Sequence, residues 1–184
     1  MLIVKGIEDR KDTKLIKQFA TYCLSRFLTK SQMRRIVVTI TYAERHEIKD
    51  PVDKADLSKY EAWMIPSSDS KNHFWITLAK FALNKNAKSP LTKYKKTLKY
   101  LAHELVHVKQ FFTGEMSDVF KNGELVGTRW HGVDYPELSP KYCVTNPIKA
   151  EWVYYESPWE LEAYGRTDGL YNMFHDEHGE EWLK

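Results

Sequence analysis

The sequence predicts a single domain that mixes helices and strands, of the α/β or α+β class. The chain has 184 residues, 42% hydrophobic and 14% aromatic, which is enough for one domain with a substantial core and little more. Two long segments have the apolar spacing of helices, and several shorter segments are β-branched or alternate between apolar and polar residues. We therefore expect residues 1–184 to form one domain.

The N-terminal part of the chain is expected to supply most of a sheet. Its β-branched or alternating segments predict strands at residues 1–5, 35–42, 62–65 and 73–80. Residues 13–27 carry apolar side chains at helical spacing and predict an amphipathic helix between the first two strands. Residues 43–60 are charged, contain a proline and are interpreted as a loop.

The C-terminal part is expected to supply two long helices. Ser89-Pro90 offers a cap and a first-turn proline for a helix over about residues 90–113. Apolar residues recur through that segment at intervals of three and four, which predicts a helix with one buried face. Ser157-Pro158 begins a second helix over about residues 158–175 in the same way.

Glycine marks the turns between and within these elements. Asn122-Gly123 predicts a hairpin turn between two strands. Residues 131–150 contain prolines and are interpreted as a loop. Gly165 and Gly169 interrupt the second helix, which indicates close approach of a neighbouring element.

Charge is distributed unevenly along the chain although the net charge is only +3. Residues 80–110 hold eight lysines and one acid, whereas residues 151–184 hold nine acids and two basic residues. One interpretation is that the two segments attract each other across the fold. The other is that Lys80–Lys99 forms a basic surface for nucleic acid.

Composition also limits the cellular context. Two cysteines, Cys23 and Cys143, are too few for a disulfide framework. The chain contains neither the apolar core of a signal peptide nor an 18-residue apolar stretch. We expect a cytoplasmic protein without a membrane partner, although a virion component or a protein released by lysis has the same features. No pattern assigns an oligomeric state.

The first long helix contains the motif His103-Glu104-Leu105-Val106-His107, which has the form H-E-x-x-H. Residues four apart lie one above the other on a helix, so two imidazoles can bind one Zn²⁺ while the intervening Glu lies beside it. Helical phase supports this interpretation, because the two histidines lie about 160° from the apolar stripe centred on Leu105. They share a face with Tyr100 and Gln110 and are expected to line a cleft.

A third metal ligand must come from another segment. A third histidine six residues after His107 is excluded, because Thr113 occupies that position. The remaining candidates are His131, Glu160 and Glu162. Two of them also have structural interpretations. Glu160 completes a capping box with Ser157, and Glu162 is placed for a helical ion pair with Arg166.

The zinc helix and the later Glu-x-x-Ala sequence resemble the gluzincin peptidases. More narrowly, L-A-H-E-L-V-H-V-K-Q with a later P-W-E-L-E-A is similar to small metallopeptidase-like proteins common in bacteriophage genomes. The resemblance covers about residues 73–175. It implies one catalytic Zn²⁺ and Glu160 as the third ligand, followed by Ala163. Tyr164 occupies the next position, where the family often has an Asp or Asn that orients a zinc histidine.

The resemblance also implies a fold and a substrate. The expected fold is α+β and zincin-like, with a small twisted, mostly antiparallel sheet packed on helices and the metal between two of them. The expected substrate is a peptide or protein, which in that family adds to a sheet edge as a strand. Residues 73–80 occupy the corresponding place in this sequence, and they are interpreted either as that edge or as an ordinary covered strand.

These observations predict a zinc-dependent metallopeptidase in which Glu104 is the general base. Negative charge develops on the carbonyl oxygen during hydrolysis, and the candidate donors that would stabilise it are His131, Tyr155, Tyr164 and Arg166. Two alternatives come from other functional classes. The first is a non-catalytic protein with a structural zinc site, such as a virion component. The second is a nucleic-acid-associated protease that uses the basic surface Lys80–Lys99.

Overall fold

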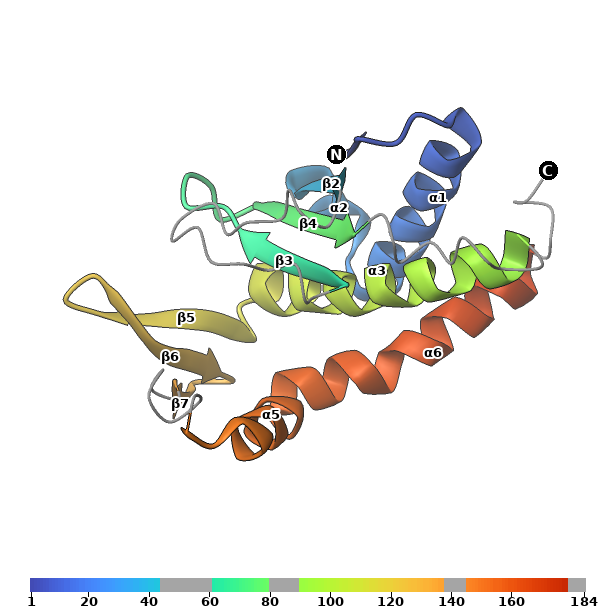
Figure 1. Ribbon diagram of the computed structural model, residues 1–184. Helices are drawn as coiled ribbons and strands as arrows, with labels where there is room; N and C mark the ends of the chain where they lie inside the picture. The colour runs from blue at the N-terminus through green and yellow to red at the C-terminus, as the bar shows by residue number, and fades with distance from the viewer. Residues whose placement is uncertain (44–60, 80–89, 138–144, 179–184) are drawn as a thin grey trace.

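The computed structural model, which describes residues 1–43, 61–79, 90–137 and 145–178, is α+β as predicted (Figure 1). The first sheet contains β1 (Leu2–Lys5), β2 (Val37–Ala43), β3 (Ala62–Pro66) and β4 (His73–Ala79). The second sheet contains β5 (Met116–Lys121), β6 (Glu124–Trp130) and β7 (Val133–Pro136). The described helices are α1 (Arg10–Phe27), α2 (Lys30–Arg35), α3 (Pro90–Thr113), α5 (Pro147–Tyr155) and α6 (Pro158–His178).

The first sheet has the strand order β1-β2-β4-β3. β1 pairs with β2 and β2 pairs with β4 in parallel, and only β3 is antiparallel to its neighbour β4. The expectation of a mostly antiparallel sheet is therefore wrong for the sheet that packs on the helices. The physical reason is the connection: α1 and α2 lie between β1 and β2, and a helical crossover returns the chain in the same direction.

Alternate residues of the inner strands form the core with α1 and α3. Ile40 of β2 and Ile76 of β4 are fully buried, and so are Leu101 and Leu105 of the apolar stripe of α3. The predicted apolar face of α1 is buried as well, including Phe19. Side chains in strands point alternately to the two faces, so this burial pattern follows directly from strand and helix periodicity.

The second sheet confirms the predicted hairpin. Asn122 and Gly123 both have positive φ, at 54° and 85°, as a two-residue hairpin turn between β5 and β6 requires. The prediction of a loop over residues 131–150 is wrong at both of its ends, where β7 and the start of α5 lie. Every residue of β7 is exposed, and Ile148 and Trp152 of α5 face solvent. Without a buried face, neither segment has the periodic pattern by which strands and helices are recognised.

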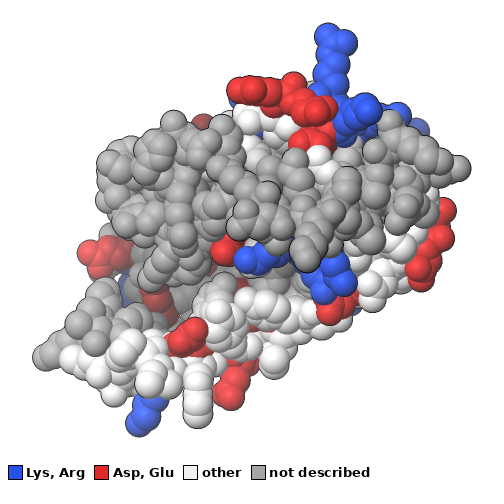
Figure 2. Space-filling model, turned by 45° about the vertical axis from the view of Figure 1, so that its right-hand side comes forward, with Lys and Arg blue, Asp and Glu red and all other residues white. Residues whose placement is uncertain are grey.

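Helix α6 lies along α3 in the opposite direction, and this contact joins the basic and acidic segments (Figure 1). Lys99 of α3 forms an ion pair with Asp168 of α6, and Lys109 forms one with Glu162. These pairs confirm the predicted attraction between the two segments. In the view of Figure 2, blue and red side chains are mixed and not gathered into one charged patch.

The lysines proposed for nucleic-acid binding are described only in part. Lys80, Lys85 and Lys88 lie outside the described residues. Two of the others have acidic partners: Lys96 pairs with Glu61, and Lys99 with Asp168, as above. None of the described helices is both long enough and apolar enough to cross a membrane.

The two glycines of α6 do not mark a close approach. A methyl group added at Gly165 or at Gly169 would have no neighbouring heavy atom within 4 Å among the described residues. Both positions are helical and exposed, so the glycines lower helix stability without any gain in packing. Gly127 of β6 is different, because an added methyl group would lie 2.2 Å from the backbone oxygen of Tyr135.

We therefore predict that Gly165→Ala and Gly169→Ala each raise the free energy of unfolding by about 0.5–1 kcal/mol, because alanine loses less backbone entropy in a helix. Urea denaturation would measure the change. Gly127→Ala is the contrasting variant and should be destabilised. A loss of stability in both α6 variants would contradict the assignment of open space at these positions.

Candidate metal centre

The two histidines of the motif meet at one point on α3. His103 and His107 are one helical turn apart, and their Nε2 atoms are 3.1 Å from each other. Their rings are almost perpendicular, with centroids 4.7 Å apart. Both side chains are nearly buried, at 9% and 7% exposure. The helical spacing thus directs two ring nitrogens toward a single point, as the sequence predicts.

The third group at this point comes from the first turn of α6. Glu160 is 2% exposed, and its Oε2 lies 3.1 Å from Nε2 of His103. Its Oε1 lies 3.3 Å from Nε2 of His107. One nitrogen from each histidine and one oxygen of Glu160 all lie within 4.8 Å of one another. Among the described residues, these three side chains form the one cluster of His, Cys, Asp or Glu that could hold a metal ion.

The donor set fits a divalent metal of the zinc type. Ligand atoms about 2.0–2.1 Å from a tetrahedral ion are about 3.3 Å apart. Here the two ring nitrogens are 3.1 Å apart, and each lies 3.1 or 3.3 Å from a different oxygen of the Glu160 carboxylate. One polar atom at this point also lacks a partner: within the described chain, Oε2 of Glu160 is buried without a hydrogen bond. Buried lone pairs directed at one point are costly unless a cation neutralises them, and two imidazoles with a carboxylate are typical zinc ligands.

The carboxylate and an imidazole strongly perturb each other's protonation. Burial alone would raise the pKa of Glu160, but its contacts with His103 and His107 outweigh burial and lower that pKa to about 2. Burial alone would lower the pKa of His107, but Glu160 and Glu104 outweigh it and raise that pKa to about 9. Without a metal, the fold therefore holds an imidazolium and a carboxylate together at this point.

Glu104 lies beside these three residues, on the side of strand β3. Its side chain is 7% exposed, and burial raises the pKa of its carboxyl group. The two histidines and a hydrogen bond from the backbone N–H of Met64 in β3 act in the opposite direction. Glu104 thus lies between the two histidines of α3 and the edge strand of the first sheet.

Three tyrosines lie on the other side of the centre. The ring of Tyr164 packs on the ring of His103 at 4.4 Å, and Tyr155 contacts Tyr164 in turn. Tyr154, which the sequence did not single out, interacts directly with Glu160: burial, and then this carboxylate, raise the pKa of its hydroxyl group. With eleven tyrosines in the chain, only position in the fold distinguishes Tyr154 from the others.

The remaining candidates have other partners. His131 adopts a positive φ of 46° in the turn after β6 and packs on Trp130, and no contact between described residues joins it to the metal ligands. Glu162 forms the predicted ion pair with Arg166, with Nε 2.8 Å from Oε1. The guanidinium of Arg166 also lies over the ring of Phe27. Neither residue of this ion pair has its charged group at the three ligands.

The capping-box interpretation of Glu160 is wrong. The backbone N–H and the hydroxyl group of Ser157 both donate to the carbonyl oxygen of Tyr154. A capping box would need the N–H of Ser157 to bond with the Glu160 carboxylate. Glu160 is turned instead toward the two histidines, as its burial and the short distances to both rings show.

The sheet edge near the centre belongs to β3 and not to the expected segment 73–80. β4 is an inner strand, hydrogen-bonded to β2 on one side and to β3 on the other. Bonds from Ala79 to Glu61 and from Ser67 to His73 mark the odd-numbered residues of β3 as those bonded to β4. The alternate residues, including Met64, direct their backbone groups to the other edge, where no described strand pairs with them.

Comparison with known proteins gives no relative. The chain matches no protein-family model, and the searches of curated proteins and of solved structures found no significant match. The chemical interpretation of the centre therefore depends on its own residues: two imidazoles, two carboxylates and a tyrosine cluster, brought together between α3, α6 and β3.

The His107 pKa predicts how the stability of the metal-free protein depends on pH. The folded-state pKa is about 9, against about 6.5 in an unfolded chain. The stabilisation is therefore complete below pH 6.5 and is lost as pH rises to 9. We expect urea denaturation to show a loss on the order of 3 kcal/mol between pH 6 and pH 9.5.

Two variants test the origin of that loss. His107→Gln should flatten the pH dependence, because the titrating imidazole is gone. His131→Asn is the matched control: it removes an exposed histidine at a positive φ that asparagine tolerates, and should keep the wild-type slope. An unchanged slope in His107→Gln would show that the imidazole does not carry the effect.

Proposed function

We propose that this protein is a zinc-dependent metallopeptidase of the gluzincin type. The observation that supports it most is the convergence of His103 and His107 from α3 with Glu160 from α6, beside a further buried carboxylate, Glu104. Three protein ligands leave a coordination position open for water or substrate, as in catalytic zinc sites. A structural site has no need of a carboxylate at the position of Glu104.

The residues of the centre would have separate roles in catalysis. A bound Zn²⁺ would lower the pKa of a water molecule and polarise the carbonyl group of the substrate. Glu104 accepts the proton of the attacking water and passes it to the leaving amine, which breaks the peptide bond. Its raised pKa suits this role, because a general base works best when its pKa approaches the working pH.

The tyrosines supply the hydrogen-bond donors that the reaction needs. Negative charge develops on the carbonyl oxygen when water adds, and a phenolic O–H can donate to that oxygen. Tyr154 and Tyr164 are the strongest candidates, because both interact with Glu160 and Glu104. Tyr155 follows through its contact with Tyr164. His131 and Arg166 are weaker candidates, since the first packs on Trp130 and the second forms an ion pair with Glu162.

The substrate would be an extended peptide lying along β3. Met64 and the other even-numbered residues direct their backbone groups to the edge that no described strand covers. A peptide that pairs with this edge by main-chain hydrogen bonds would pass close to Glu104. The lysine surface remains a separate hypothesis for nucleic acid, and salt-dependent binding to DNA at low ionic strength would test it.

The role of Glu104 can be tested by Glu104→Gln. The variant should keep the wild-type zinc stoichiometry and lose about 10²–10⁴-fold in the rate of peptide hydrolysis, because the amide cannot accept the proton. Zinc content by metal analysis and digestion of a peptide library measure the two effects. Glu124→Gln, at an exposed position of β6, is the control. Wild-type cleavage by Glu104→Gln would contradict the mechanism.

The identity of the third ligand is tested by zinc stoichiometry. Glu160→Ala should lower the zinc content of the purified protein, because one of three ligands is removed. His131→Ala should leave it unchanged, since that side chain has its contacts elsewhere. Equal zinc content in Glu160→Ala and wild type would transfer the role of third ligand to another residue.

A further inference from the structure

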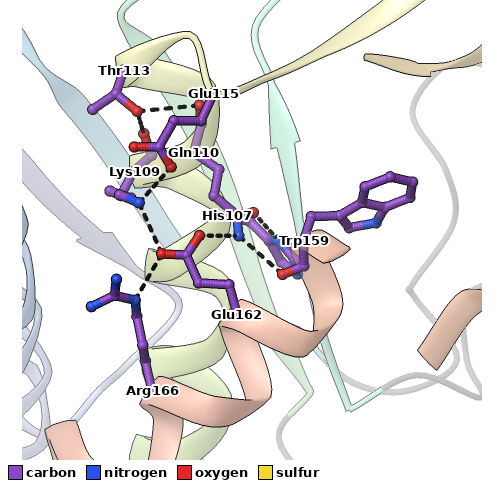
Figure 3. A network of polar contacts seen from close by, with 8 residues as sticks. All are labelled: His107, Lys109, Gln110, Thr113, Glu115, Trp159, Glu162 and Arg166. Atoms are coloured by element: carbon purple, nitrogen blue, oxygen red, sulfur yellow. Dashed lines mark hydrogen bonds and ion pairs between the residues drawn. The ribbon is translucent and has the colours of Figure 1, made fainter. Parts of the chain in front are cut away.

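Gln110 lies directly behind His107 and is completely buried (Figure 3). Its amide makes three contacts. Oε1 lies 2.8 Å from Nδ1 of His107, and Nε2 donates at 3.0 Å both to the carbonyl oxygen of Trp159 and to Oε2 of Glu162. One side chain of α3 thus joins a metal-ligand histidine to two residues of α6.

The partners of Gln110 determine which way its amide faces. A backbone carbonyl can only accept hydrogen bonds, and an ionised carboxylate can only accept as well. Lys109 and Arg166 both donate to Oε1 of Glu162, which leaves Oε2 as the acceptor for Gln110. The two amide hydrogens are therefore used on the α6 side, and Oε1 must face His107.

This orientation determines the tautomer of His107. Because the amide oxygen is an acceptor, Nδ1 of the imidazole must carry a hydrogen and donate it. In the metal-free protein the imidazolium also carries a hydrogen on Nε2, and metal binding displaces that hydrogen. Because Nδ1 keeps its own hydrogen for Gln110, Nε2 is the nitrogen whose lone pair then becomes free. Nε2 is the atom directed at His103 and Glu160, and so the network prepares the nitrogen that a metal would bind.

The same side chain also holds the helix that supplies the third ligand. Trp159 and Glu162 lie on either side of Glu160 in the first turn of α6, and Gln110 bonds to both. His103 has no equivalent support: its Nδ1 has no hydrogen-bond partner among the described residues, and its ring is held by packing against Tyr164. Hydrogen bonds thus hold the ring of His107 in place, whereas packing holds the ring of His103.

We propose that Gln110, held by Glu162, is a positioning residue of the metal centre. It keeps the His107 ring in the Nδ1–H tautomer, with Nε2 presented to the ion, and it fixes the first turn of α6 so that Glu160 reaches the same point. This inference rests on the proposed zinc site. It does not depend on whether the site hydrolyses peptides.

Zinc affinity, measured by competition with a chelator, gives the first test. Gln110→Met keeps the approximate volume of the side chain and removes all three polar contacts, so zinc should bind about 10–100-fold more weakly. Asp168→Asn is the matched control, because it removes an ion pair between the same two helices at a position about two turns after Glu160. Its zinc affinity should change less than about twofold, as expected for an exposed pair.

A spectroscopic measurement separates positioning from general destabilisation. In zinc-loaded protein with ¹⁵N-labelled histidine, the wild-type His107 should show a slowly exchanging Nδ1–H and an Nε2 without hydrogen. In Gln110→Met the Nδ1–H should exchange quickly with solvent, while the His103 signals change little. Zinc bound through Nδ1 of wild-type His107 would overturn the proposal.

Exchanging the amide and the carboxylate between positions 110 and 162 tests the contact between Gln110 and Glu162. Gln110→Glu places a carboxylate against Glu162 and should weaken zinc binding. The double variant Q110E/E162Q restores a donor opposite an acceptor, while the carboxylate at position 110 still accepts from His107. Its affinity should recover by roughly fivefold or more over Gln110→Glu, as is typical of directly coupled residues. No recovery, or wild-type affinity in Gln110→Met, would overturn the positioning role.

The outcomes separate this proposal from the peptidase proposal. Normal zinc binding by wild type with unaffected Gln110 variants removes the positioning role and leaves the peptidase proposal intact. Zinc binding that depends on Gln110, without any peptide hydrolysis, supports the positioning role and removes the peptidase. A wild-type protein that binds no zinc overturns both.

Discussion

The contact between α3 and α6 is the constraint on which the centre depends. The buried face of α6 includes Glu160 and, one turn later, Ala163. A single methyl group at Ala163 lets the two helices approach closely, and the approach takes the Glu160 carboxylate out of water. Burying a carboxylate is costly unless it is paired. The two imidazoles of α3 supply that pairing, so the packing of two helices and the chemistry of the centre have one structural cause.

Electrostatics and packing make different contributions to this contact. The basic and acidic segments of the chain meet where α3 and α6 run side by side (Figure 1). Lys99–Asp168 and Lys109–Glu162 are ion pairs between them. The Lys99–Asp168 pair, with its acid exposed, adds little to stability. The buried apolar residues of both helices supply most of the stabilisation, while the charged pairs favour the antiparallel alignment that brings Glu160 opposite His107.

Strand β3 completes the centre from the other side. The helical crossover between β1 and β2 makes the first sheet largely parallel, and β3 is added as the antiparallel edge. The edge position leaves the backbone N–H of Met64 unpaired by β4, and this N–H donates to Glu104. Segment 73–80 has the stronger strand pattern because it is an inner strand with a neighbour on each side. The strong alternation of apolar and polar residues in segment 73–80 is therefore typical of an inner strand of this sheet and not of its open edge.

By itself the sequence determined everything that follows from local periodicity. The positions of His103, Glu104 and His107 on one helix, the start of each long helix and the turn at Asn122-Gly123 depend on residues a few positions apart. The tertiary structure alone decided which acid joins the histidines. Residues two apart on a helix point about 200° from each other, so once α6 is docked only one of Glu160 and Glu162 can face them. Gln110 and its partner Trp159 are 49 residues apart in the chain, and no local pattern records a contact that packing alone creates.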